Sequence, residues 1–414
     1  MVTAKWLLCG LGLVALSAML GLTGCEKKEG GGASAGGERP APKAAAPRGQ
    51  TPVGEGNTYD TGSGPIKVGH FGSLTGPQAT FGQSTSQGLR LAIEEFNAAG
   101  GLNGRQVALV EYDTKGDARE AGLVVTRLVN SDKVSAVLGE VASSLSLAGA
   151  PVAQQAGVPM VSPSSTNPRV TEVGDMIFRV CFIDPFQGQV CATFAKERGI
   201  STVAILYDQS QAYSAGLATE FERAFVKLGG TISGKQTYNE GDQDFTAQLT
   251  AIRSGNPGMI FIPGYYTDVA NIAIQARKLG VTVPLLGGDG WDSSKLAEIG
   301  GTAVEGSFYS NHYTVDDPSP VIQDFIRKYR AKFGQVPDGL AALGYDAARL
   351  LFEAMARARS LHGGHLRDAI AATREFHGVT GTISINDKRD AVKPAVIVEM
   401  KGGQPRYVAT VNPE

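Results

Sequence analysis

The chain has 414 residues and a formal net charge of −2, with 42% apolar and 19% charged residues. This near-neutral composition lacks the basic footprint of a nucleic-acid-binding protein, so nucleic acid is not an expected partner. The apolar content supports a large core, but the length exceeds that of a usual single domain, and two lobes are therefore expected.

Residues 1–25 are typical of a secretory signal. Lys5 precedes a short apolar stretch, residues 6–22, that is rich in Gly and Ala. Such a stretch favours a cleaved signal over a stable membrane span. Leu22-Thr23-Gly24-Cys25 then resembles the bacterial lipoprotein cleavage box, in which the Cys becomes the acylated first residue. We therefore expect a lipid on Cys25 that holds the protein at a bacterial membrane, with an uncleaved anchor helix as the alternative.

Residues 26–64 change composition to Gly, Ala, Pro and Ser, with almost no large apolar side chains. Such a segment cannot bury enough surface to offset its ordering entropy. A flexible coil of this length has a root-mean-square span of roughly 35 Å. We interpret it as a tether between the lipid and the folded part.

Strands alternate with amphipathic helices from Ile66 almost to Ala372. The predicted strands cover residues 66–71, 106–112, 136–139, 159–161, 202–207, 231–236, 259–262, 284–286 and 306–308. This alternation predicts an α/β protein with parallel, doubly wound sheets and right-handed crossovers.

Helices are predicted from apolar residues at helical spacing, as in Leu89, Ala92, Ile93 and Phe96. Gly residues at positions 100, 229 and 280 are placed to end helices in the left-handed conformation. The C-terminal part departs from the alternation, with helices predicted at 320–333, 341–360 and 364–373. Short strands near 381–385, 395–400 and 406–410 are then expected to complete the sheets.

Four polar or Gly-rich segments each follow a predicted strand. They are Ser143-Ser144, Ser162-Pro163-Ser164-Ser165-Thr166, Gly264-Tyr265-Tyr266 and Gly287-Gly288-Asp289-Gly290-Trp291. Because α/β proteins bind ligands beyond the carboxyl ends of their strands, these segments predict one shared pocket. Hydroxyls and helix-start amides suit an anion, one carboxylate suits a cation, and aromatic rings suit an apolar body. Together they complement an amino acid zwitterion.

Further motifs carry a resemblance to a known family. They are Ser73-Leu74-Thr75-Gly76-Pro77, Phe81-Gly82, Gly100-Gly101-Leu102-Asn103-Gly104, Tyr112-Asp113-Thr114 and Gly344-Tyr345-Asp346-Ala347. In order and spacing they resemble the leucine/isoleucine/valine-binding proteins of bacterial ABC importers, over essentially the whole of residues 66–410. The resemblance implies a type I periplasmic-binding fold, in which three crossing strands join two α/β lobes around a solute cleft. Lobe 1 would comprise residues 65–182 and 311–392, and lobe 2 residues 183–310 and 393–411.

The resemblance also implies roles for hydroxyl side chains. Ser143, with Ser144 beside it at a predicted helix start, matches the serine that holds the ligand's α-carboxylate. Ser164 and Thr166 match a second set of ligand contacts. On local grounds alone, Ser143 could equally be an ordinary helix N-cap, and the other two could belong to a Ser/Pro turn.

Asp289 matches the acidic residue that pairs with the ligand's α-ammonium group, although an Asp among glycines is more often a turn residue. Tyr213 and Tyr265 match aromatic walls on the second lobe, and Phe81 matches a first-lobe aromatic that closes over the solute. Trp291, two residues past the acidic position, is expected to line the side-chain pocket.

Two cysteines remain after the signal segment, Cys181 and Cys191. An oxidising compartment would permit a disulfide between them. The alternative is two small packed thiols, and the sequence leaves this choice open.

No catalytic or cofactor motif is evident. The five histidines show no metal-ligand spacing such as His-Glu-x-x-His, and there is no Gly-x-Ser-x-Gly elbow. The Gly100–Gly104 tract follows a helix, whereas a dinucleotide-binding loop follows a strand. We therefore predict no enzyme, metal or cofactor.

The sequence predicts a monomeric, lipid-tethered protein outside the cytoplasm that binds an aliphatic or aromatic amino acid and delivers it to an ABC permease. The alternatives are an amide or urea-type solute, or a sensory module. Neither the particular amino acid nor the membrane leaflet follows from the sequence.

Overall fold

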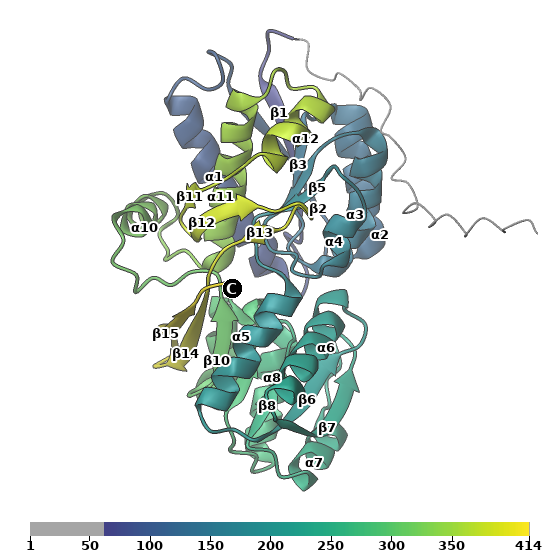
Figure 1. Cartoon of the computed structure of the whole chain (residues 1–414), viewed down its shortest axis with the longest axis vertical. Coiled ribbons are helices and arrows are strands. Elements are labelled where there is room, and N and C mark those ends of the chain that lie inside the picture. The colour runs from purple at the N-terminus through teal and green to yellow at the C-terminus, as the bar shows by residue number, and fades with distance from the viewer. Residues whose placement is uncertain (1–61, 414) are drawn as a thin grey trace, which may run out of the picture. The chain divides into compact units, whose positions relative to one another are not determined.

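In the computed structural model, residues 62–413 are described. The predicted signal, the lipid site Cys25 and the tether up to residue 61 lie outside the described residues. All described residues belong to one compact unit. Two large sheets and one small sheet organise it (Figure 1).

The first sheet is entirely parallel, with strand order β2-β1-β3-β4-β5. Its strands are β1 (Ile66–Gly72), β2 (Val107–Asp113), β3 (Ala136–Leu138), β4 (Met160–Ser162) and β5 (Ile177–Arg179). Helices cover both faces: α1 packs against α11 on one face, and α2 against α3 on the other (Figure 1). The covering helices are α1 (Ala79–Ala98), α2 (Ala118–Arg127), α3 (Ser143–Ala156) and α11 (Gly339–Arg357). This half also contains the short helix α4 (Arg169–Glu172) and a π-helical turn at Leu128–Asp132.

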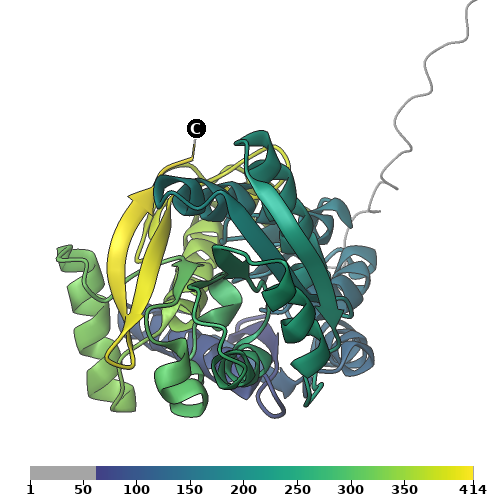
Figure 2. The same cartoon turned by 90° about the horizontal axis from the view of Figure 1, so that it is seen from below.

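The second sheet has seven strands in the order β15-β14-β10-β9-β8-β6-β7. Its parallel strands are β6 (Thr202–Asp208), β7 (Thr231–Tyr238), β8 (Met259–Phe261), β9 (Leu285–Gly287) and β10 (Phe308–Asn311). The hairpin of β14 (Ala395–Lys401) and β15 (Gln404–Val411) joins β10 in antiparallel pairing and forms one edge, yellow in Figure 2. The helices of this half are α5 (Asp184–Glu197), α6 (Ala212–Lys227), α7 (Thr246–Ser254), α8 (Tyr266–Lys278) and α9 (Ser294–Gly300).

The chain passes between the two large sheets three times: after β5, after β10 and after β13. After β10 it forms α10 (Pro320–Phe333) and then α11, which packs on α1 of the first half. It continues through α12 (Gly363–Ala371) and the small antiparallel sheet of β11 (Phe376–Gly378), β12 (Gly381–Ile385) and β13 (Ala391–Val392) before returning to β14. The predicted fold class, two parallel-dominated α/β halves with three crossings, is confirmed.

Most predicted elements are present, with ends shifted by up to three residues. Strands β5, β11 and β13 were not predicted. The strand expected near 381–385 does not complete a large sheet, because it pairs with β11 and β13 instead. The three glycines expected to end helices do adopt positive φ, with values of 103° for Gly100, 73° for Gly229 and 75° for Gly280.

The hydrophobic core lies between each large sheet and the helices that cover it. Strands β8 and β9 are buried along their whole length, as expected for parallel strands covered by helices on both faces. Among residues 62–413, no helix combines the length and apolar character needed to cross a membrane.

Candidate functional site

A small cavity lies at the carboxyl ends of strands from both large sheets. Its lining residues are Phe81, Val141, Ser164 and Leu340 from the first half, and Tyr213, Tyr265, Asp289 and Gly290 from the second. Its volume is only about 10 Å³, roughly enough for one water molecule. A solute of amino acid size therefore enters only when the two halves move apart.

Hydrogen bonds between the two halves hold this closed arrangement. The Gln78 side chain donates to Glu240 at 2.6 Å, and the Thr267 hydroxyl donates to the Pro77 carbonyl at 2.9 Å. The hydroxyls of Thr80 and Ser293 lie 3.0 Å apart. These contacts join the two halves and must break when the halves move apart.

Asp289 is the charged group of the cavity. It is 5% exposed and accepts three hydrogen bonds: Gln187 Nε2 to Oδ1 at 2.7 Å, Ser164 Oγ to Oδ2 at 3.2 Å, and His312 Nε2 to Oδ2 at 3.0 Å. Burial alone would raise the pKa of Asp289, but the contacts with His312 and Gln187 outweigh it and hold this pKa below its ordinary value. The carboxylate is therefore ionised and suited to a cationic group.

Three aromatic rings form the apolar wall, as the resemblance implies. Tyr213 and Tyr265 stack in parallel with ring centres 5.3 Å apart, and Phe81 meets Tyr265 edge-on at 5.4 Å. The Tyr213 hydroxyl accepts a hydrogen bond from the Gly290 amide at 3.1 Å. A Cβ at position 288 would lie 2.3 Å from this hydroxyl, so only glycine fits there.

The two serines at the start of α3 have different contacts. Ser143 is the first residue of the helix, but the N-cap position belongs to Ala142. The Ser143 hydroxyl accepts from the Asn167 amide at 3.3 Å, which joins it to the segment that carries Ser164 and Thr166. The Ser144 hydroxyl accepts from the Ala212 amide at 2.9 Å and so links α3 to the start of α6 in the other half.

Arg179 holds the segment that carries Ser164 and Thr166 through hydrogen bonds to its backbone. This guanidinium is fully buried, donates to the carbonyls of Ser165 and Asn167, and forms an ion pair with Asp390 at 2.8 Å. Thr166 is also fully buried, and its hydroxyl lies beside the buried carboxyl of Asp184, whose pKa burial raises to about 8 against the opposing contact with Thr166.

Trp291 does not line the cavity as we had expected. Its ring packs on the backbone of Gly287, and its Nε1 donates to the Ile262 carbonyl at 2.9 Å. The physical reason is the 3₁₀ turn formed by Asp289–Trp291, in which side chains two residues apart point to different sides. Trp291 is therefore core packing behind the site.

Cys181 and Cys191 are free, buried thiols, so the disulfide left open by the sequence is not formed. Each sulfur has its own neighbour: Cys181 Sγ lies 3.3 Å from the Ser165 carbonyl, and Cys191 Sγ lies 3.5 Å from Ser310 Oγ. Burial raises the pKa of both thiols to about 12, which leaves them protonated and unreactive.

Sequence reasoning missed four residues of the site: Val141, Leu340, Gln187 and His312. Val141 and Leu340 line the cavity, while Gln187 and His312 hold Asp289. His312 could have been found, because it directly follows strand β10 as the four polar segments follow theirs. Gln187 lies in the first turns of α5 and carries no comparable signal.

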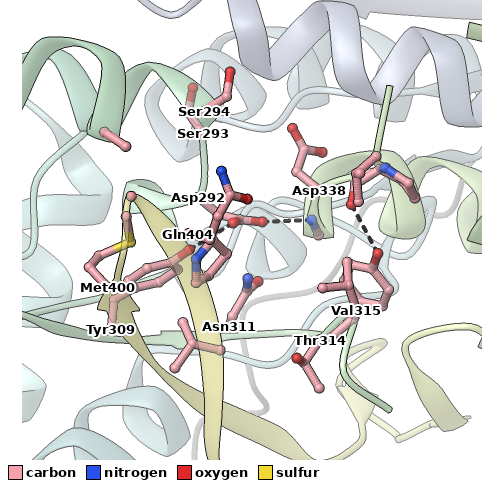
Figure 3. A pocket seen from close by; sticks show the side chains of 18 residues that line it. Asp292, Ser293, Ser294, Tyr309, Asn311, Thr314, Val315, Asp338, Met400 and Gln404 are labelled. Atoms are coloured by element: carbon pink, nitrogen blue, oxygen red, sulfur yellow. Dashed lines mark hydrogen bonds between the residues drawn. The ribbon is translucent and has the colours of Figure 1, made fainter. Parts of the chain in front are cut away.

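A second cavity, of about 110 Å³, lies beside the β14–β15 hairpin and the start of α11 (Figure 3). Asp292 joins the two halves here, because it follows β9 and accepts hydrogen bonds from the Gly339 amide at 2.6 Å and from Tyr309 at 3.0 Å. Asp338 caps α11 through the Ala341 amide at 2.8 Å and accepts from Ser84 at 2.6 Å. Within residues 62–413, no cluster of His, Cys, Asp and Glu is arranged to hold a metal ion.

Asp338 is expected to make stability depend on pH. Burial, aided by the charge of Asp292, raises the pKa of Asp338 from 3.8 to about 7. The stabilising contribution of its protonated form is thus complete below about pH 4 and is lost as the pH rises through about 7. We expect Asp338→Asn, which mimics the neutral acid and keeps the cap, to reduce the fall in melting temperature between pH 5 and 8.

Scanning calorimetry at several pH values measures this effect. The matched control is Asp117→Asn at the exposed N-cap of α2, where Asp117 accepts from the Glu120 amide at 2.8 Å. A pH slope of Asp338→Asn equal to that of the wild type would contradict the assignment.

Comparison with known proteins decides the family. A family model described as periplasmic binding protein matches residues 65–404. The chain belongs to the periplasmic binding protein family. This periplasmic binding protein is 30% identical to the leucine-, isoleucine-, valine-, threonine- and alanine-binding protein of Pseudomonas aeruginosa, over 80% of this chain and 89% of the relative. It is 31% identical to Leu/Ile/Val-binding protein homolog 2 of Brucella abortus, over 82% of this chain and 91% of the relative.

Solved structures agree with these relatives. The leucine-binding protein LivK of Thermotoga maritima is 42% identical, with a TM-score of 0.81 over 84% of this chain and 99% of its own. LivJ of Streptococcus pneumoniae, solved in complex with isoleucine, is 33% identical, with a TM-score of 0.80 over 84% of this chain and 100% of its own. The predicted relationship to the leucine/isoleucine/valine-binding proteins and the type I fold are confirmed. The family consists of substrate-binding proteins of transporters and not of enzymes.

Proposed function

We propose that this periplasmic binding protein captures an α-amino acid with an aliphatic or aromatic side chain and delivers it to an ABC permease. The observation that carries the proposal is an ionised, buried Asp289 in the same cavity wall as the stacked rings of Tyr213 and Tyr265. A cationic group bound beside an apolar body is what an amino acid presents. The relatives named for leucine, isoleucine and valine binding support the same solute class.

In this proposal the lobe of residues 65–182 and 311–392 holds the solute carboxylate, through Ser143, Ser164, Thr166 and the start of α3. A helix N-terminus offers unpaired amides and partial positive charge for such an anion.

The lobe of residues 183–310 and 393–411 would hold the ammonium group on Asp289 and the side chain on its two tyrosines. Hinge motion then closes the lobes over the solute, with Phe81 as the lid. Closure gives both charges of the zwitterion a partner, which makes their desolvation tolerable. Burial of a leucine-like side chain adds roughly 2–3 kcal/mol.

An amino acid is expected to raise the melting temperature of the purified protein. A ligand that binds only the folded state stabilises it by about 2.7 kcal/mol at a concentration of 100 times Kd. A thermal-shift screen of all amino acids, with amides, urea and sugars included, measures the effect. Stabilisation by amides or urea without stabilisation by any amino acid would overturn the zwitterion interpretation and favour the alternative solute class.

A sensory module that reports ligand occupancy to a membrane receptor is the second candidate function. It would use the same cleft, so binding data do not separate it from delivery. Reconstitution with an ABC permease in proteoliposomes does: delivery predicts solute uptake that depends on this protein.

We propose that the protein lies in the periplasm or at the cell surface, exported by the signal in residues 1–25 and anchored to a bacterial membrane by a lipid on Cys25. Cys25→Ala is expected to leave an uncleaved precursor that takes up no labelled fatty acid in cells, while solute binding by the purified protein is unchanged. Normal labelling of this variant would show that the N-terminus was misinterpreted. The protein is proposed to act as a monomer.

A further inference from the structure

His312 is a buried residue that neither the sequence motifs nor the proposed solute contacts include. It directly follows strand β10, at the start of the second passage between the lobes, and is 2% exposed. Its Nε2 lies 3.0 Å from Oδ2 of Asp289. We propose that His312 is a positioning residue, which orients the Asp289 carboxylate for the ammonium group of the solute and anchors it to the segments that connect the lobes. The inference rests on the proposed function.

The hydrogen bonds define the state of the ring. An ionised carboxylate can only accept, so the proton on this contact belongs to Nε2 of His312. Nδ1 is buried and has no hydrogen-bond partner among the described residues. A charged ring would bury an unpaired N–H at this position, which is costly, whereas a neutral ring places only a lone pair there. In agreement, burial lowers the pKa of His312 to about 4, against the opposing effect of Asp289.

The ring orientation is fixed by a residue of the first connecting segment, and a charge from the third acts on the ring. Phe182, in the first segment, stacks on the His312 ring with centres 3.8 Å apart and planes at 21°. Lys393, in the third segment, is close enough for its charge to contribute to the lowered pKa of His312. Asp289 and Lys393 are the charged groups that act on this ring. Because the stack fixes the ring plane, it also fixes the direction of the Nε2–H bond.

The other donors to Asp289 cannot replace this contact in the open protein. Gln187 donates to the other oxygen, Oδ1. Ser164 shares Oδ2 but belongs to the opposite half, so its hydrogen bond breaks when the cleft opens. His312 directly follows β10, which pairs with β9 in the sheet that leads into Asp289, so this contact lies at the boundary of the second half and does not depend on the first half closing. Such preorganisation increases affinity by reducing the ordering cost of binding.

Two substitutions separate the donor from the ring. His312→Phe keeps an aromatic ring on Phe182 but removes the N–H, whereas His312→Gln supplies an amide N–H that can reach Asp289. In calorimetric titration with L-leucine at pH 7, we expect His312→Phe to weaken binding roughly 10- to 100-fold and His312→Gln to stay within about threefold of the wild type. Wild-type affinity in His312→Phe, or equal losses in both variants, would overturn the proposal.

A pH profile provides a readout that packing alone would not change. As the pH falls toward about 4, His312 gains a proton and competes with the solute's ammonium group for Asp289. Wild-type affinity for L-leucine should therefore fall between pH 6 and pH 4, and His312→Gln should lose this dependence. The same acid dependence in both proteins would count against His312.

Nitrogen NMR of protein labelled only at histidine tests the pairing without any solute. We expect His312 to be a neutral ring protonated at Nε2 down to about pH 5, and we expect Asp289→Asn to change its tautomer or its titration. Titration near pH 6.5, or no response to Asp289→Asn, overturns the proposal even if His312→Phe fails to fold. If the tautomer is as expected but no amino acid binds the wild type, the pairing stands and the proposed function fails.

Discussion

Asp289→Asn is expected to weaken amino acid binding by roughly 30-fold to several-thousand-fold, which corresponds to about 2–5 kcal/mol. The substitution keeps the shape of the side chain and removes its charge. In the closed cleft, the solute's ammonium group would then be buried without a counter-ion. Calorimetric titration of wild type and variant, with the amino acid selected by the thermal-shift screen, measures the loss.

Folding of the ligand-free variant should change little, because the neighbours of Asp289 can adapt. The new Asn can keep its oxygen toward His312 Nε2 and Ser164, and Gln187 can turn its amide so that its Oε1, which has no partner within residues 62–413, accepts from the Asn nitrogen. A matched control is Asp208→Asn, at the end of β6, where the buried carboxylate accepts from the Ser210 amide at 2.8 Å and does not line the cavity. An affinity loss under about threefold in Asp289→Asn would show that Asp289 is only a turn former.

The fold could be predicted from the sequence wherever a helical period or a short apolar run lies between turn residues. Helix α10 occupies the predicted residues, Pro320–Phe333, because its apolar side chains repeat over four turns between a proline at its start and a glycine after its end. Strand β5 was missed although β3, β4, β8 and β9 are equally short. It follows the four-residue helix α4, so the alternation with a long amphipathic helix that marks the other strands is absent there. Strand β12 was predicted as a strand, but its partners come from tertiary pairing that a local pattern does not encode.

The cavity could be predicted in outline because parallel strands bring their carboxyl ends to one edge. That argument placed Ser164, Tyr265 and Asp289 near one another, and all three line the cavity. The same argument does not predict in which direction each side chain of a turn points. Trp291 was therefore assigned to the pocket, although its ring points into the core. The argument also cannot predict residues that act through another side chain, such as Gln187, because Gln187 and its partner Asp289 are about a hundred positions apart in the sequence.

Asp390→Ala is expected to lower the free energy of unfolding by about 3–5 kcal/mol, the second large effect that the structure predicts. Asp390 is 3% exposed and pairs with Arg179, which is fully buried. Removal of the carboxylate leaves the guanidinium charge in the core without a counter-ion. Urea unfolding of wild type and variant measures the difference, and Asp387→Ala, at an exposed position of the same loop, is the control that should change stability by less than about 0.5 kcal/mol.

The double variant Arg179→Met with Asp390→Ala separates two effects: the destabilisation by an unpaired buried charge, and the loss of the Arg179 hydrogen bonds to the binding segment. With both charges removed, no ion is left unpaired, so stability should recover by at least about 1 kcal/mol relative to Asp390→Ala. Solute affinity should not recover, because the carbonyls of Ser165 and Asn167 lose the donors that hold the segment carrying Ser164 and Thr166. If Asp390→Ala lowers the free energy of unfolding by less than about 1 kcal/mol, the ion pair does not stabilise the lobe. If the double variant binds solute like the wild type, Arg179 does not shape the site.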